Sequence, residues 1–136
     1  MRSRIIRRIR PDRKLAVDSL RRASRDIETA RTLIENEKFD WSLAVSYNAI
    51  LQAGRALMYS QGYRPSSTEG HVAVVRFLQT SNEAEIRDRM TLVLNGMRKK
   101  RHRIVYEEMD IVSKEEAEQA LKWAEEFVNI IHEKIP

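Results

Sequence analysis

The chain has 136 residues, of which 42% are hydrophobic and 33% charged, a balance typical of one globular domain and unlike that of a disordered chain. It contains no cysteine, which excludes disulfides and thiolate metal sites. No apolar run approaches the roughly 20 residues that span a bilayer, and the basic N-terminus lacks the apolar core of a signal peptide, so we expect a cytoplasmic protein without membrane contact.

Positive charge is concentrated in two segments of the chain. The net charge is +5, yet residues 1–14 hold seven Lys/Arg and one Asp, and residues 98–103 hold five Lys/Arg and no acid. The rest of the chain is therefore net acidic. Basic segments attract phosphate groups, although a solvated basic face is the commoner explanation for any one of them.

The first of these segments defines a basic N-terminal arm, residues 1–11, in front of a bundle domain, residues 12–136. Two interpretations of the arm stay open. Its arginines could contact nucleic acid, whereas Ile5, Ile6 and Ile9 could form a short amphipathic piece that packs on the bundle or on a partner subunit.

Apolar residues recur at helical spacing along the bundle domain, and the chain has only four glycines and three prolines to interrupt helices. The fold class that follows is all-α, an up-and-down bundle of about five helices. The second helix is apolar over most of its circumference and carries small residues, so we expect it at the bundle centre. The expected helices cover residues 12–38, 41–61, 69–78, 83–107 and 114–134.

Polar residues mark the expected helix ends. Asp12 and Asp40 are predicted N-caps, because a carboxylate there accepts hydrogen bonds from free backbone N–H groups. Ser113 with Glu116 fits the capping-box pattern, and Asn82 with Glu85 resembles it. The clearest loop covers residues 62–68, with Gly62 after the second helix.

The basic run lies near the end of the fourth helix. At about 100° per residue, Arg101 falls within the apolar face, and Arg98, His102 and Tyr106 form a row beside it. A guanidinium cannot lose its proton, so Arg101 must reach solvent, pair with an acid, or face a site for an anion or a second subunit. The predicted core residues of this helix are Ile86, Met90, Val93, Met97 and Ile104.

The side chains of this row suit contact with nucleic acid. Arginine can hold phosphate by two hydrogen bonds, histidine can exchange a proton near neutral pH, and tyrosine can stack on a base. The three histidines, His71, His102 and His132, show no metal-ligand spacing, so we expect neither a metal nor a cofactor. His71 is expected to cap a helix or lie on the surface. The aromatic residues expected in the core or an interface are Trp41, Tyr47 and Trp123.

Three segments of the chain resemble the HEPN family of small helical domains. They are residues 46–57 followed by 62–65, residues 70–78, and residues 97–106 followed by an alanine-bearing helix at 115–117. The resemblance implies a helical bundle that often forms homodimers. It also implies metal-independent endoribonuclease activity in many members, and RNA or partner binding without activity in others. Small prokaryotic members are often encoded beside a minimal nucleotidyltransferase, frequently as a toxin–antitoxin pair.

The ribonuclease motif of the family is an arginine, a polar residue such as asparagine, and a histidine a few residues later. Arg101 matches the arginine, His102 occupies the usual asparagine position, and Tyr106 stands where the histidine is expected. If Arg98 were the arginine of the motif, three residues would separate it from His102, one fewer than the usual minimum in the family. The pKa of a tyrosine hydroxyl is about 10 in model peptides, so tyrosine is a weak general base at neutral pH.

The resulting hypothesis is RNA or nucleotide association with weak or lost endoribonuclease activity. The candidate catalytic residues are Arg101, His102 and Tyr106, and in a homodimer two such rows could face each other. A non-enzymatic module that binds a nucleotidyltransferase partner is the alternative, and a purely structural bundle with solvated arginines is the third reading. The candidate binding residues for RNA or nucleotide are Arg98, Lys99, Arg101 and Arg103.

Overall fold

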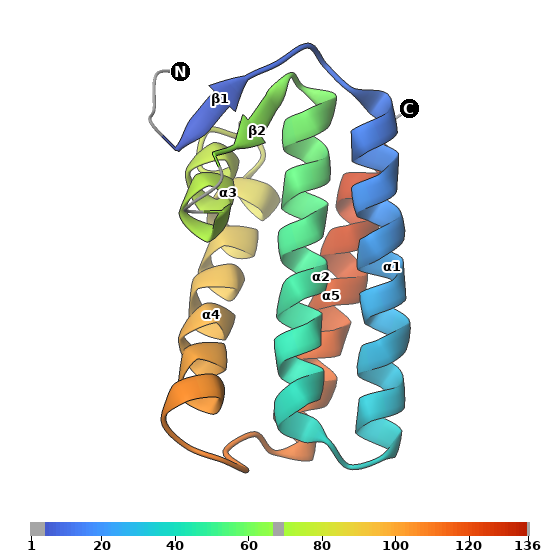
Figure 1. Ribbon diagram of the computed structural model, residues 1–136, viewed down its shortest axis with the longest axis vertical. Coiled ribbons are helices and arrows are strands. Elements are labelled where there is room, and N and C mark those ends of the chain that lie inside the picture. Colours follow the sequence, from blue (N-terminus) through green and yellow to red (C-terminus); the bar gives the residue numbers. More distant parts are fainter. Residues whose placement is uncertain (1–4, 67–69, 136) are drawn as a thin grey trace.

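The computed structural model describes residues 5–66 and 70–135, and these form the predicted helical bundle. Figure 1 shows the long helices running up and down side by side. The second helix contacts all four other α-helices, as its small residues predict. The described elements are β1 (Ile6–Arg8), α1 (Arg13–Glu35), α2 (Phe39–Ser60), β2 (Tyr63–Pro65), α3 (Gly70–Leu78), η1 (Glu85–Met90), α4 (Thr91–Tyr106) and α5 (Lys114–Lys134).

The centre of the bundle is close-packed around α2. Ala49, Ala53 and Ala56 are fully buried, which lets neighbouring helices approach the α2 backbone. A Cβ atom on Gly54 would overlap the side chain of Val74 in α3, so the missing side chain is what allows α3 to lie against α2. This contact fixes the position of α3, and therefore of His71 near its first turn.

Two of the predicted helix caps are present. The Asp12 carboxylate accepts a hydrogen bond from the Leu15 backbone N–H at 3.0 Å, and α1 begins directly after it. Ser113 and Glu116 form the reciprocal capping box at the start of α5. Both caps satisfy backbone N–H groups that a helix start would otherwise leave without a partner.

The other two predicted caps are wrong. Asp40 lies inside the first turn of α2, and its carboxylate accepts hydrogen bonds from the backbone N–H groups of Asp110 and Val112 at 2.7 and 3.0 Å. It therefore ties the loop after α4 to the start of α2. The Asn82–Glu85 box is not formed either, because the Ser81 hydroxyl accepts the N–H of Glu83 instead.

The fourth predicted helix begins with a π-helical turn, η1, before the regular helix α4. A π-helical turn holds more residues than an α-helical turn, so it shifts the angular position of every side chain that follows. Leu94 is consequently fully buried, whereas Val93 is only half-buried at the edge of the core. The other predicted core residues are buried: Ile86, Met90, Met97 and Ile104.

The N-terminal arm forms a strand. Residues 6–8 pair antiparallel with residues 63–65, within the segment predicted to be a loop, and this small sheet lies beside α3 at one end of the bundle (Figure 1). Ile6 is buried in the core, which agrees with the interpretation that the isoleucines pack on the bundle. Hydrophobic periodicity does not predict this sheet, because each strand is only three residues long. The parts of the predicted arm, loop and third-helix start at residues 1–4 and 67–69, and the final residue 136, lie outside the described residues.

Two of the three aromatic residues predicted to lie in the core or an interface contact the core. Tyr47 is buried in the core and Trp123 is half-buried against it, as expected, but Trp41 at the start of α2 is 53% exposed. No helix among the described residues is long and apolar enough to cross a membrane.

Candidate phosphate and nucleic-acid interface

A chain of hydrogen bonds joins three helices at the face where α2, α3 and α4 meet. The Tyr47 hydroxyl of α2 lies 2.6 Å from Nδ1 of His71 in α3, and Nε2 of His71 lies 3.1 Å from Oδ1 of Asn95 in α4. The rings of Tyr47 and His71 also stack, with centroids 5.7 Å apart. We call these residues the Tyr47–His71–Asn95 chain. It uses both nitrogens of the imidazole, so the ring orientation is fixed from two sides.

The protonation state of His71 follows from this arrangement. Burial lowers the pKa of the imidazole from its usual 6.5, the charge of Arg98 lowers it further, and the hydrogen bond to Asn95 acts in the opposite direction. A neutral ring with its proton on Nε2 donates to Asn95 and accepts from the Tyr47 hydroxyl, which satisfies both contacts. His71 is therefore a half-buried linking residue, contrary to the prediction of a cap or surface residue.

Three arginines surround this chain, and we call Arg55, Arg98 and Arg101 the arginine cluster. Burial raises the pKa of the Tyr47 hydroxyl, and the charges of all three guanidiniums act to lower it. Arg101 reaches over the Tyr47 ring, with its guanidinium carbon 5.9 Å from the ring centroid, within the range of a cation–π contact. Positive charge from α2 and α4 therefore converges on one buried phenol.

The position of Arg101 agrees with one of the predicted possibilities. It follows Leu94 by seven residues and so lies on the same face of α4, but the side chain is exposed. The guanidinium extends over the Tyr47 ring. Arg101 therefore lies on the core side of the helix, as predicted, and reaches solvent, which is one of the three predicted possibilities.

The arginine cluster has no carboxylate partner in residues 5–66 and 70–135. Its neighbours in the basic run differ in this respect. Arg103 pairs with Glu108 at 3.0 Å, and Lys100 pairs with Glu116 of α5 at 3.2 Å. Of the predicted binding residues, Arg103 is thus partly neutralised, whereas no described carboxylate offsets the charge of Arg98 or Arg101.

The remaining predicted site residues lie on the outer side of α4. His102 and Tyr106 are exposed, and their ring centroids are 4.9 Å apart. Lys99 is exposed as well. The row predicted from helical spacing is therefore present, and Asn95, one turn before Arg98, extends it to the Tyr47–His71–Asn95 chain.

Sequence reasoning missed Arg55, His71 and Asn95 as members of the site. Asn95 could have been found, because it precedes Arg98 by three residues and continues the same row. Arg55 and His71 lie on other helices, and their approach to α4 depends on tertiary packing that no periodicity shows. Both lie in segments that carry the family resemblance, so the resemblance, unlike helical spacing, could have pointed to them.

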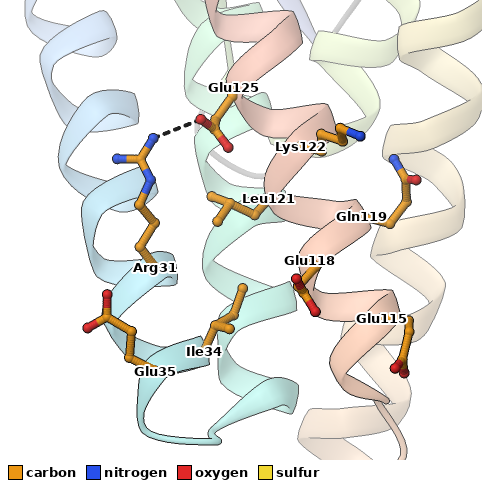
Figure 2. A pocket seen from close by; sticks show the side chains of 9 residues that line it. All are labelled: Arg31, Ile34, Glu35, Glu115, Glu118, Gln119, Leu121, Lys122 and Glu125. Atoms are coloured by element: carbon orange, nitrogen blue, oxygen red, sulfur yellow. Dashed lines mark hydrogen bonds and ion pairs between the residues drawn. The ribbon is translucent and has the colours of Figure 1, made fainter.

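A second polar region lies on another side of the bundle, between α1 and α5. A hollow of about 580 Å³ lies there. In Figure 2, Arg31 of α1 points towards Glu125 of α5, with further carboxylates nearby. The Arg31–Glu125 pair is 2.8 Å long and half exposed. The carboxylates that line this hollow repel phosphate, so it does not suit a nucleic-acid ligand. No group of three or more His, Asp or Glu among the described residues could hold a metal ion.

The architecture and the site define the class of protein: a helical bundle with an arginine-rich polar face on α2, α3 and α4. The family model for the HEPN domain matches residues 16–135. Since the match covers most of the chain, the chain belongs to the HEPN family. A comparison with individual curated proteins gives no match.

Proposed function

We propose that this HEPN protein associates with RNA or a nucleotide through the arginine cluster and the exposed row of α4. The observation that carries the proposal is the convergence of three arginines without carboxylate partners, in the described structure, on the buried Tyr47 hydroxyl. Guanidiniums suit phosphate because their N–H groups can bind two of its oxygens at once. Such a protein would act in the cytoplasm, where RNA and nucleotides are available.

The outer part of the row adds contacts that phosphate binding does not need. The exposed rings of His102 and Tyr106 offer flat surfaces on which an unpaired base can stack. Lys99 is exposed on the same helix and can add an electrostatic contact to the nucleic-acid backbone. The arrangement therefore favours single-stranded or loop RNA over a regular duplex.

The same geometry favours binding over cleavage. Cleavage of RNA without a metal needs a group that removes a proton from the 2′-hydroxyl and a group that protonates the leaving oxygen. Tyr106 stands at the histidine position of the family motif, and His71 has both nitrogens in hydrogen bonds. If the protein cleaves RNA, Arg101 would hold the phosphate and His102 would transfer the proton, with weak activity.

Binding of a fluorescently labelled hairpin RNA, followed by anisotropy, tests the proposal. Replacing Arg101 by alanine should weaken binding about tenfold, because a charged hydrogen-bonded contact contributes about 1.5–3 kcal/mol. Arg22→Ala on α1 is the matched control, since it removes one exposed arginine outside the site. Equal binding by the wild type and Arg101→Ala would refute RNA association through this row.

A second function, binding of a protein partner, is favoured by an apolar hollow of about 530 Å³ between α4 and α5. Leu92 at its rim is 74% exposed, and Val93, Met97 and Trp123 line it. Exposed apolar surface of this kind often marks a protein interface. A second copy of the chain or a nucleotidyltransferase, as in a toxin–antitoxin pair, is the proposed partner.

The partner proposal is tested by co-expression with the product of a neighbouring nucleotidyltransferase gene and by light scattering of the protein alone. Leu92→Asp should abolish the complex or the homodimer, because a charge in an apolar interface is strongly unfavourable. A complex that survives this change would exclude the hollow as the interface. RNA binding by a Leu92→Asp monomer would separate the two functions.

A further inference from the structure

We propose that the arginine cluster and Tyr47 form a subsite for a phosphomonoester, the terminal phosphate of an RNA or of a nucleotide. This inference rests on the proposed function and specifies the ligand group that the inner part of the site holds. A terminal phosphate carries about −1.5 to −2 charges near neutral pH, whereas each phosphodiester of the backbone carries one. The chemistry of the subsite favours the more highly charged group.

The first support is the charge around the Tyr47 hydroxyl. Arg55 belongs to α2, and Arg98 and Arg101 belong to α4, so the positive charge surrounds the phenol from two helices. No carboxylate among the described residues pairs with any of the three. Like charges gathered around one group are stabilised by an anion, and we propose that one dianionic phosphoryl group binds between these arginines.

The second support is the contact between Arg55 and the start of α3. A Cβ atom on Gly70 would lie 2.7 Å from a terminal nitrogen of Arg55, closer than side chains are found. The absence of a side chain at Gly70 thus allows the guanidinium to lie beside the residue that precedes His71. A side chain at this position would require the Arg55 guanidinium to move.

The third support is the fixed position of Tyr47. Its hydroxyl is held by His71, which Asn95 holds in turn, so the phenol and the imidazole keep their places when no ligand is bound. Because its hydroxyl gives its one proton to His71, Tyr47 serves as a rigid floor under Arg101 and not as a donor to the phosphate, and a rigid floor reduces the conformational freedom lost on binding. The exposed row of His102 and Tyr106 continues outward from this floor, where the nucleoside attached to the phosphate would lie.

The test compares two short RNA oligomers of one sequence, one ending in a 5′-phosphate and the other in a 5′-hydroxyl, together with a 3′-phosphate version. Isothermal titration calorimetry with the wild-type protein should give about tenfold tighter binding for a phosphorylated end, as expected for contacts with a charged group. AMP and adenosine, compared in the same way, show whether a free nucleotide also binds. Equal affinity for all phosphorylated and unphosphorylated pairs would overturn the inference.

Variants assign the preference to the cluster. Arg55→Gln should make the affinities for the 5′-phosphate and 5′-hydroxyl oligomers equal, while the control Arg22→Gln keeps the preference. Gly70→Ala retains every charge but displaces Arg55, so it should reduce the preference severalfold. A preference that persists in both Arg55→Gln and Gly70→Ala contradicts the subsite. If no oligomer binds at all, the proposed function fails; if all bind alike, only this subsite fails.

Discussion

The arginines on two faces of the bundle differ in whether a carboxylate pairs with them. On the α5 side, Arg31 pairs with Glu125 at 2.8 Å, and Arg89 forms a two-point contact with Glu126 at 2.5 and 3.0 Å. On the face of α2, α3 and α4, the arginine cluster has no carboxylate partner in the described part of the chain. The same residue type is thus neutralised within the protein on one face and left charged on the other.

Under the proposed function, this difference separates arginines that pair within the protein from arginines that bind a ligand. An exposed ion pair contributes little to stability, about 0–1 kcal/mol, so the pairs of Arg31 and Arg89 with α5 mainly keep that face neutral. Like charges gathered beside a half-buried polar chain lower stability, and this cost is offset when an anion binds. Arg22 on α1 also lacks an ion pair among the described residues, so the marker of the binding face is the gathering of three such arginines around the Tyr47 hydroxyl.

The largest predicted effect comes from removing charge on the two faces in matched amounts. The double variant Arg98→Gln/Arg101→Gln should weaken binding of a hairpin RNA about 100-fold, because two charged phosphate contacts are lost. Arg31→Gln/Lys122→Gln removes the same charge from the hollow between α1 and α5 and should change binding less than about threefold. Similar losses in both double variants would mean that net charge alone attracts the RNA.

A smaller effect is predicted for the hydrogen-bonded chain below the cluster. Tyr47→Phe removes the hydroxyl that lies 2.6 Å from His71 and leaves the imidazole nitrogen without this donor. The free energy of unfolding should fall by about 1 kcal/mol, measured by urea denaturation. The matched comparison is Tyr63→Phe in β2, which also removes one tyrosine hydroxyl. A destabilisation equal in both variants would show that the Tyr47 hydroxyl has no special role.

The pH dependence of stability should reveal His71. Its pKa is lowered in the folded protein from 6.5, so the unfolded chain takes up a proton before the folded chain does as the pH falls. The stabilisation is therefore present above about pH 6.5 and is lost as the pH drops through the lower folded pKa. Urea denaturation from pH 8 to pH 5 should show a shallower decline in His71→Gln than in the wild type. Identical slopes would contradict the burial argument, and His132→Gln on α5 is the control.

The smallest effect is expected on the paired face. Glu125→Gln breaks an ion pair whose two side chains are each nearly half exposed, so the free energy of unfolding should change by less than about 1 kcal/mol. RNA binding should not weaken. A marked loss of RNA affinity would place the ligand at the α1–α5 hollow and reverse the comparison between the two faces.

The fold could be predicted from the sequence because helical periodicity and small residues report directly on local structure. The expected ranges of the five helices agree closely with the structure, and the central place of α2 follows from Ala49, Ala53 and Gly54. The errors arise where a local rule competes with a distant contact. Asp40 has the chemistry of a cap, but the backbone of residues 110 and 112 uses its carboxylate.

The site could be predicted only along one helix. The spacing of Arg98, His102 and Tyr106 identifies the row on α4, since residues four apart share a face. The partners on α2 and α3 are far away in sequence, and His71 gains its role only when α3 packs against Gly54. The π-helical turn before α4 also shifts the buried face in a way that regular 100° spacing does not anticipate.

The central claim, that the arginine cluster marks the ligand face, is tested most directly by NMR of arginine side chains in the intact protein. The Nε–Hε signals are followed while a short 5′-phosphorylated RNA is added. The account predicts shifts for Arg55, Arg98 and Arg101 and unchanged signals for Arg31 and Arg89, whose partners are carboxylates. Shifts confined to Arg31 and Arg89, or none in the cluster on saturation with RNA, would contradict it.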